Sequence, residues 1–129
     1  MGLTMRMLVR VLWIATIAVG SGCGDRGVQL DDWAEHFVAA QQALDKGDNP
    51  KALEELSASI ASEPNALAYY QRAKLYSESG DDKAALDDCE AGLAQNARDK
   101  NLKWLYDELK KPARKRFKGK FARPPSDFK

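Results

Sequence analysis

The chain has 129 residues and two cysteines, with 20 Lys and Arg against 19 Asp and Glu, a formal net charge of +1. This length suits one small domain, and two cysteines are too few for a disulfide-rich scaffold. The balanced total hides a split. Residues 25–109 carry 18 acidic and 9 basic residues (net −9), and residues 110–129 carry 9 basic and 1 acidic (net +8). Such a split is typical of a folded body followed by an interaction tail.

The N-terminal segment has the pattern of an export signal. Arg6 and Arg10 precede an apolar run that continues to Val19, and the small residues 20–22 stand directly before Cys23. Residues 11–22 number 12, whereas a helix that crosses a bilayer needs about 20. A basic start, a short apolar stretch and a small-residue exit are typical of a cleaved signal peptide.

Because a cysteine follows the small residues, residues 1–22 resemble a bacterial lipoprotein signal peptide with its lipobox. Ser21 and Gly22 match that pattern, whereas Gly20 stands where an apolar residue such as leucine is usual. The resemblance implies cleavage before Cys23, acylation of Cys23 with chains such as palmitate, and a tether over residues 23–30. The alternative is an ordinary cleaved signal that leaves Cys23 as a free thiol.

The apolar spacing turns helical beyond this tether, and no alternating run suggests a strand. Asp32 followed by Glu35 predicts a capping box for the first helix, and Gly47 predicts its end. Asn49-Pro50 predicts the N-cap and first turn of a second helix, which Pro64 closes. The expected buried positions of these two helices are Trp33, Phe37, Ala40, Leu44, Leu53, Leu56 and Ile60.

Three more helices are expected. The third runs from about Ala66 to Ser79, Gly80 ends it, and Asp81 caps the fourth. A fifth amphipathic helix runs through residues 102–109 and stops before Pro112. The expected inward positions are Tyr69, Tyr70, Ala73, Tyr76, Leu86, Cys89 and Leu93, then Leu102, Leu105, Tyr106 and Leu109, with Trp104 nearby. The body is therefore predicted to be all-α.

The first four helices divide into two copies of one unit, 33 residues apart. Matching pairs are Gly47 and Gly80, Ala52 and Ala85, Leu56 and Cys89, and Pro64 and Ala97. A period in the low thirties built from helix–turn–helix pairs is typical of a repeat solenoid. The second copy resembles a tetratricopeptide repeat through Tyr69, Ala73, Tyr76, Gly80 and Ala85. The first copy fits less well, with His36 and Ala43 at aromatic positions. The resemblance spans residues 33–99 and implies a short α-solenoid over residues 31–111, which the fifth helix caps.

The resemblance also implies a peptide-binding groove along the first helix of each unit. Its positions here are Phe37, Val38, Gln41, Leu44 and Asp45 in the first unit and Tyr70, Gln71, Lys74, Ser77 and Glu78 in the second. This set lacks the asparagines and lysines with which some family members clamp a terminal carboxylate. The alternative is that these residues pack against the tether or the tail.

A basic tail over residues 112–129 follows the body. Its end is expected to be disordered when unbound. Its basic residues, counted from the end of the fifth helix, are Lys110, Lys111, Arg114, Lys115, Arg116, Lys118, Lys120 and Arg123. Three phenylalanines, Phe117, Phe121 and Phe128, interleave with them. This composition suits an anionic membrane surface or a phosphate backbone. A solvated tail, or one folded back on the acidic body, is the other interpretation.

The chain shows no recognisable catalytic or metal-binding motif. His36, the single histidine, lies beside an apolar stripe, and Cys89 lies within one, where cysteine behaves as a small hydrophobe. The pairs Asp81-Asp82 and Asp87-Asp88 lack the spacing of a calcium loop. No glycine-rich phosphate cradle is present. The sequence therefore predicts no catalytic activity, no metal and no cofactor.

These patterns together predict a lipid-anchored interaction module of the bacterial cell envelope, at the outer membrane or the periplasmic face. Its expected partners are an envelope protein or peptide and the membrane, reached through Cys23 and also through the basic tail. Two small units bury little surface, which also favours a homodimer. The alternative is a cytoplasmic RNA- or ribosome-associated helical protein that uses the basic tail, and export would exclude nucleic acid as a partner.

Overall fold

The structure is a computed structural model that describes residues 30–117, and residues 1–29 and 118–129 lie outside this description. The described residues form helices and turns, with no strand among them. The helices are α1 (Asp32–Asp45), α2 (Asn49–Ser62), α3 (Ala66–Ser79), α4 (Asp82–Gln95) and α5 (Lys100–Lys110), followed by the short 3-10 helix η1 (Ala113–Lys115). The all-α prediction is confirmed.

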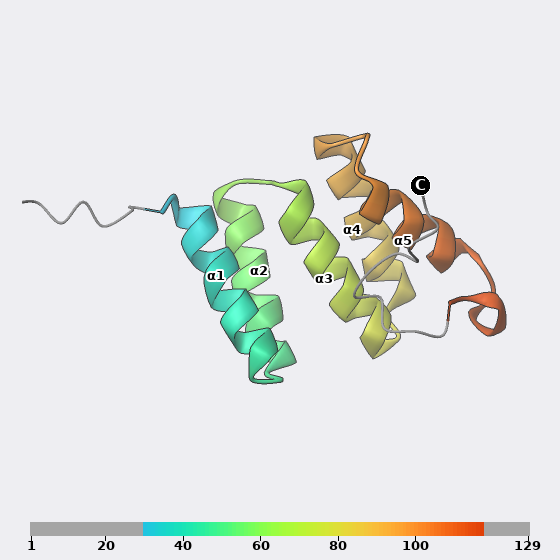
Figure 1. The fold of residues 1–129 in the computed structure, drawn as a ribbon, viewed down its shortest axis with the longest axis horizontal. Coiled ribbons are helices and arrows are strands. Elements are labelled where there is room, and N and C mark those ends of the chain that lie inside the picture. Colours follow the sequence, from blue (N-terminus) through green and yellow to red (C-terminus); the bar gives the residue numbers. More distant parts are fainter. Residues whose placement is uncertain (1–29, 118–129) are drawn as a thin grey trace, which may run out of the picture.

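Two helix hairpins stand side by side and a fifth helix closes the row (Figure 1). The tightest contacts lie within the hairpins, between α1 and α2 and between α3 and α4. Contact between α2 and α3 joins the hairpins, and α5 packs on both α4 and α3. The predicted short helical-repeat array with a C-terminal capping helix is therefore confirmed.

Glycines end two of the helices, as predicted. Gly80 follows α3 with φ +86° and Gly47 follows α1 with φ +74°, in the left-handed region that glycine enters without a steric penalty. Asp81 caps α4, because its carboxylate accepts a hydrogen bond from the Ala84 N–H at 3.1 Å. The turn inside each hairpin is thus encoded locally.

Two predicted caps are displaced by one residue. The N-cap of α1 is Asp31, not Asp32, and its side chain makes no capping hydrogen bond, so the predicted capping box is wrong. The N-cap of α2 is Asp48, whose carboxylate accepts from the Lys51 N–H at 3.1 Å, and Asn49 is already helical. In both places consecutive polar residues offer two candidate caps, and only the packing of the helix decides between them.

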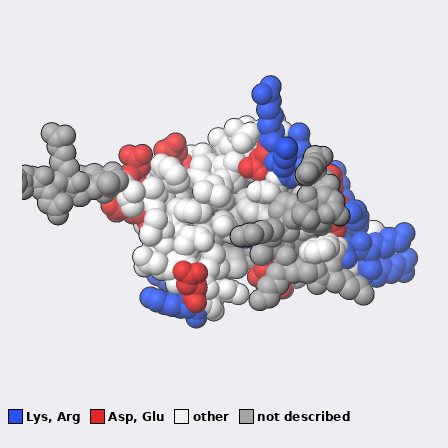
Figure 2. Space-filling model, in the orientation of Figure 1, with Lys and Arg blue, Asp and Glu red and all other residues white. Residues whose placement is uncertain are grey.

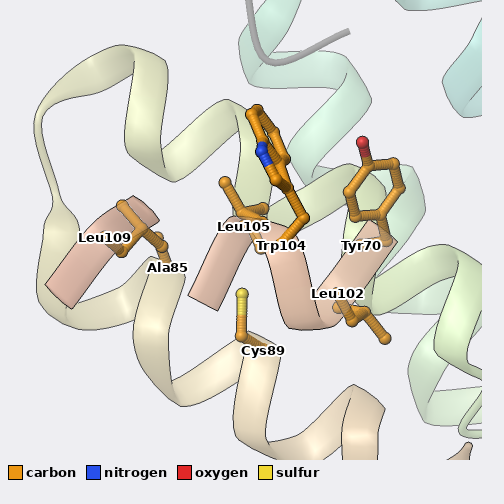
Figure 3. Packing of buried hydrophobic residues seen from close by; sticks show 8 residues of the cluster. Tyr70, Ala85, Cys89, Leu102, Trp104, Leu105 and Leu109 are labelled. Carbon is orange, nitrogen blue, oxygen red and sulfur yellow. The ribbon is translucent and has the colours of Figure 1, made fainter. Parts of the chain in front are cut away.

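The core divides into two clusters that follow the hairpins. The first hairpin cluster contains Ala40, Ala43, Ala52, Leu56, Ala68 and Leu75. The second, at the C-terminal end of the row, contains Tyr70, Ala73, Ala85, Cys89, Leu102, Trp104, Leu105 and Leu109 (Figure 3). Helix α3 contributes side chains to both clusters. Helix α3 is therefore part of the core of both hairpins.

Gly92 on α4 packs closely against both α3 and α5. A Cβ at this position would lie 2.7 Å from Cδ1 of Leu102 and 3.0 Å from Cβ of Tyr69. Both distances are shorter than ordinary van der Waals contact, so a side chain here would push α5 or α3 away from α4. The sequence analysis did not single out this glycine.

Candidate functional site

The ten candidate groove residues, here called the candidate face, lie on α1 and α3, the first helices of the two hairpins. On α1, Val38 is 43% exposed and Asp45 is also exposed. Phe37 and Leu44 are partly buried and pack against the first core cluster. Gln41 is partly buried as well. Helix α1 therefore offers apolar and amide surface next to solvent.

On α3 the candidate face is more deeply covered. Tyr70 is 6% exposed and belongs to the second core cluster, where burial raises its pKa to about 12. The Lys74 ammonium lies 5.0 Å from the centroid of the Tyr70 ring, and burial lowers the pKa of Lys74. Gln71 and Ser77 are partly buried, and Glu78 is exposed. Tyr70 thus serves mainly as packing, and its neighbours form the accessible part of α3.

Two polar atoms of the candidate face are buried and have no hydrogen-bond partner within residues 30–117. They are Nε2 of Gln41 on α1 and Oγ of Ser77 on α3. A buried polar group without a partner costs about 1–3 kcal/mol, so most such groups in folded proteins are satisfied. Both exceptions fall on residues that the sequence analysis assigned to binding.

Arg72 on α3 makes a polar contact that the sequence analysis did not identify. Its Nε and Nη2 donate to the two carboxylate oxygens of Asp88 on α4, at 2.8 and 2.6 Å. Its Nη1 donates to Oγ of Ser57 on α2 at 2.9 Å. The guanidinium carbon also lies 5.9 Å from the ring centroids of Tyr69 and of Tyr76. One side chain therefore joins three helices.

This Arg72–Asp88 pair is largely shielded from solvent, with side chains 19% and 8% exposed. The hydrogen bonds to Asp88 raise the pKa of Arg72 further, which favours its charged form. The pair joins the two helices of the second hairpin, and the hydrogen bond from Arg72 to Ser57 links that hairpin to the first. A lone arginine flanked by Tyr69 and Tyr76 was the signal in the sequence that could have revealed it.

The single histidine pairs within the first hairpin. Nδ1 of His36 on α1 lies 2.7 Å from Oε2 of Glu55 on α2, and Nζ of Lys51 lies 2.9 Å from the other carboxylate oxygen. The hydrogen bonds from His36 and then Lys51 lower the pKa of Glu55. His36 therefore ties α1 to α2.

Cys89 is fully buried in the second core cluster, as its position in an apolar stripe predicts (Figure 3). Burial raises the pKa of its thiol to about 12. The nucleophilic and metal-binding form of cysteine is the thiolate, which this environment disfavours. Within residues 30–117, no three His, Cys, Asp or Glu side chains gather as a metal ion would require.

The first residues of the predicted basic tail lie against the body. Arg116 donates from Nη1 to both carboxylate oxygens of Asp82 on α4, each at 2.8 Å. Its Nη2 donates to the carbonyl oxygen of Leu109 at 2.8 Å, and its Nε to that of Lys111 at 2.9 Å. These contacts, here called the Arg116 clasp, hold the chain after α5 against the start of α4.

Phe117 continues the clasp. Its N–H donates to Oε2 of Glu108 at 2.8 Å, and its ring meets the edge of Trp104 with 6.0 Å between centroids. Glu108 is buried and also pairs with the ammonium of Lys111. Part of the predicted tail is therefore a covering segment for α5.

Of the other basic residues singled out in the sequence, some are exposed and others lie outside the described residues. Lys110, Arg114 and Lys115 are exposed, and the Lys110 ammonium lies 4.0 Å from the centroid of the Tyr106 ring. Lys118, Lys120 and Arg123 lie outside the described residues, as does the lipidation candidate Cys23.

The region that the structure describes contains no helix long and apolar enough to cross a membrane. Comparison of the chain with protein-family models, curated proteins and solved structures yields no match. The functional assignment therefore depends on the sequence patterns and on the geometry described above.

Proposed function

We propose that this chain is a lipid-anchored helical-repeat lipoprotein of the bacterial cell envelope that binds another protein and catalyses no reaction. The binding part rests on one observation, the buried polar atoms of Gln41 and Ser77 that have no partner among the described residues. They lie on equivalent helices of the two hairpins, within the set that resembles the ligand-facing positions of tetratricopeptide repeats. A partner whose binding uncovered these two atoms and supplied hydrogen-bonding groups to them would remove a cost that the free protein carries.

The chemistry of the candidate face defines the kind of ligand. Helix α1 contributes the apolar side chains of Phe37, Val38 and Leu44, and α3 contributes polar groups at Gln71 and Lys74. Such a mixed surface suits a peptide segment that carries apolar side chains on one side and hydrogen-bonding groups on the other. The face lacks the residue set that clamps a terminal carboxylate, so an internal segment of the partner is the proposed ligand.

The anchor part of the proposal is supported by the basic, apolar and small-residue pattern that ends at Cys23. Helix α1 begins at Asp32. Eight residues therefore separate Cys23 from the first helix, and they span at most about 28 Å. An acylated Cys23 would keep the array within this distance of the bilayer, where several acyl chains hold a protein stably.

Site-specific photo-crosslinking in the producing cell tests the binding part. A photoreactive residue replaces Gln41 or Ser77, one position at a time, and control variants carry it at Glu54 on α2 or Lys83 on α4. The control side chains are 71% and 87% exposed and belong to the second helices of the hairpins. The proposal predicts one crosslinked partner shared by Gln41 and Ser77 and missing from both controls. The same products at all four positions would contradict it.

Replacement of the cysteine tests the anchor part separately. The wild-type chain should fractionate with membranes and the Cys23→Ser variant with the soluble fraction. The intact mass of the mature wild-type protein should correspond to a chain that starts at an acylated Cys23. An unmodified N-terminal methionine, or a soluble wild-type chain, would rule out lipid anchoring.

A further inference from the structure

Charge is graded along the row of helices. The first hairpin, residues 30–65, has eight acidic and two basic residues, a net charge of −6. The second, residues 66–97, has six acidic and three basic residues, a net charge of −3. Residues 98–117, around α5, have eight basic and three acidic residues, a net charge of +5. Figure 2 shows acidic side chains near the start of α1 and basic side chains gathered at the opposite end of the molecule.

The basic charge of α5 lies along its exposed side. Lys100, Lys103 and Lys110 are exposed, at spacings of three and seven residues that place them on one side of the helix. Leu102, Leu105 and Leu109 fill the buried side. None of the three lysines forms an ion pair within residues 30–117. These three side chains are here called the lysine stripe.

The exposed side of α1 carries the opposite charge. The N-cap residue Asp31, and Glu35 and Asp45 within the helix, are exposed, together with Val38 and Gln42, at alternating spacings of four and three residues. That spacing marks one continuous side of a helix. The three acidic residues form no ion pair in the described part of the chain. They are here called the acidic stripe, and Val38, 43% exposed, lies at its centre.

The two stripes also match in length. Glu35 and Asp45 are ten residues apart, as are Lys100 and Lys110, so each pair spans about 15 Å along its helix. The stripes lie on the first and the last α-helix of the row, which share no direct packing contact of note. Within residues 30–117, one molecule therefore presents two surfaces of opposite charge that form no ion pair with each other.

We propose that the acidic stripe of α1 in one copy docks on the lysine stripe of α5 in a second copy. Opposite charges steer the two helices together, and burial of Val38 adds an apolar contribution at the centre of the contact. Since each copy carries both stripes, two copies can close into a dimer with two such contacts, or further copies can extend the assembly. This contact shares Val38 and Asp45 with the candidate face, so a second copy and the proposed partner would compete for this side of α1.

The expected association is weak and sensitive to salt. One helix side from each copy buries less area than the roughly 1,600 Å² of a standard stable interface. Its attraction comes mainly from exposed charges, which salt screens: the Debye length falls from about 30 Å at 0.01 M to about 3 Å at 1 M. Copies held on one membrane would meet at a higher effective concentration than free copies.

Sedimentation velocity of the full chain in a non-ionic detergent tests the contact through a charge swap. One variant carries Lys100→Glu, Lys103→Glu and Lys110→Glu, and the other carries Asp31→Lys, Glu35→Lys and Asp45→Lys. A control variant reverses three exposed acids outside the stripes, Glu54→Lys, Glu63→Lys and Asp87→Lys. Circular dichroism checks that every variant keeps its helices.

The proposal predicts that the wild type associates at about 0.01 M salt and dissociates at about 1 M. Each stripe variant alone should bind itself at least about tenfold more weakly, whereas an equal mixture of the two should associate again. The control should associate like the wild type. A wild type that is monomeric at low salt, a mixture of folded stripe variants that stays monomeric, or a control that fails to associate would overturn the proposal.

Discussion

Arg72 and Asp88 form a two-point ion pair, with both carboxylate oxygens of Asp88 within 2.8 Å of guanidinium nitrogens. The pair joins α3 to α4, and the hydrogen bond from Arg72 to Ser57 extends the link to α2. Because the side chains are 19% and 8% exposed, each charge depends on the other for compensation. The two hairpins are therefore connected by electrostatics as well as by the shared packing of α3.

Removal of one charge from this pair should be costly. Asp88→Asn leaves the guanidinium of Arg72 without a countercharge in a shielded position, and we expect the free energy of unfolding to fall by about 3 kcal/mol. Urea denaturation followed by circular dichroism measures it. The neighbouring exposed pair provides the control, since Asp87→Asn disrupts only the Lys83 contact at the surface and should cost less than about 1 kcal/mol. Equal losses for the two variants would contradict the structural role of the Arg72–Asp88 pair.

Helix boundaries could be predicted from the sequence because local chemistry sets them. Gly47 and Gly80 adopt positive φ, and Pro112 follows α5 closely, so the ends of α1, α3 and α5 are encoded in single residues. The caps at Asp31 and Asp48 were missed because their polar neighbours are equally suitable cap residues. The choice between them depends on how each helix packs against its neighbour.

Contacts between helices could not be predicted in the same way. The packing of Tyr70 against side chains of α5 depends on how α5 is rotated against α3, and the pairing of Arg72 depends on which side of α4 faces α3. The hydrophobic periodicity of the sequence does not determine how one helix is rotated against another. Likewise the charge of residues 110–129 left open whether the tail is solvated, binds an anionic surface or folds back on the acidic body. The Arg116 clasp folds back, and it depends on the distance in space between Asp82 and the end of α5.

Gly92 should be intolerant of even a methyl group. In an exposed helix, Gly→Ala normally stabilises by about 1 kcal/mol, but here the new Cβ would lie 2.7 Å from Cδ1 of Leu102. We expect Gly92→Ala to destabilise the protein by about 1–3 kcal/mol through overpacking. The cost should be smaller in a Leu102→Val background, because the shorter side chain relieves the clash. Thermal unfolding of the four proteins in this double-mutant cycle measures the coupling, and strictly additive effects would contradict the close approach.

Cys89 should be unreactive in the folded protein. Its side chain is fully buried and its pKa is raised to about 12, so at pH 8 the thiolate that attacks a disulfide reagent is almost absent. In a Cys23→Ser background, Cys89 is the only thiol. We expect labelling by Ellman's reagent to be slow in buffer and complete in denaturant. Lys83→Cys in the same background should label at once at its exposed site, and equally rapid labelling of Cys89 would contradict its burial.

Glu108 should make stability depend on acidic pH. Burial raises the pKa of Glu108, but hydrogen bonds from Lys111 and from the Phe117 N–H lower it by more, so the pKa lies below the ordinary value of 4.5. A carboxylate whose pKa is depressed by folding stabilises the protein above its unfolded pKa, and this contribution is lost as the pH falls through the folded pKa.

A comparison of wild type and Glu108→Gln isolates this contribution. At pH 7 the variant should be less stable by about 1–3 kcal/mol, because it loses a charged acceptor for two donors. As the pH falls below about 4, the two proteins should converge. Asp107→Asn, which removes an exposed neighbouring carboxylate, is the matched control. Urea denaturation across this pH range measures the effect, and a stability difference that does not change with pH would count against it.

The Arg116 clasp should require the planar guanidinium and not merely a positive charge. Arg116 donates to two oxygens of Asp82 and to the carbonyl groups of Leu109 and Lys111 at once. The ammonium of lysine is a single point charge and cannot repeat this geometry. We therefore expect Arg116→Lys to lose most of what Arg116→Gln loses, about 1–3 kcal/mol, while Arg114→Gln at an exposed neighbouring position changes little.

Hydrogen exchange separates local release of the clasp from general destabilisation. The Phe117 N–H is bonded to Glu108 and lies beside the clasp, so Arg116→Lys should increase its exchange rate. Amides inside the first hairpin, which has its own core cluster, should keep their wild-type rates. Full rescue by lysine would mean that charge alone holds the segment. A uniform rise in exchange across both hairpins would mean that Arg116 stabilises the whole array rather than its C-terminal cover.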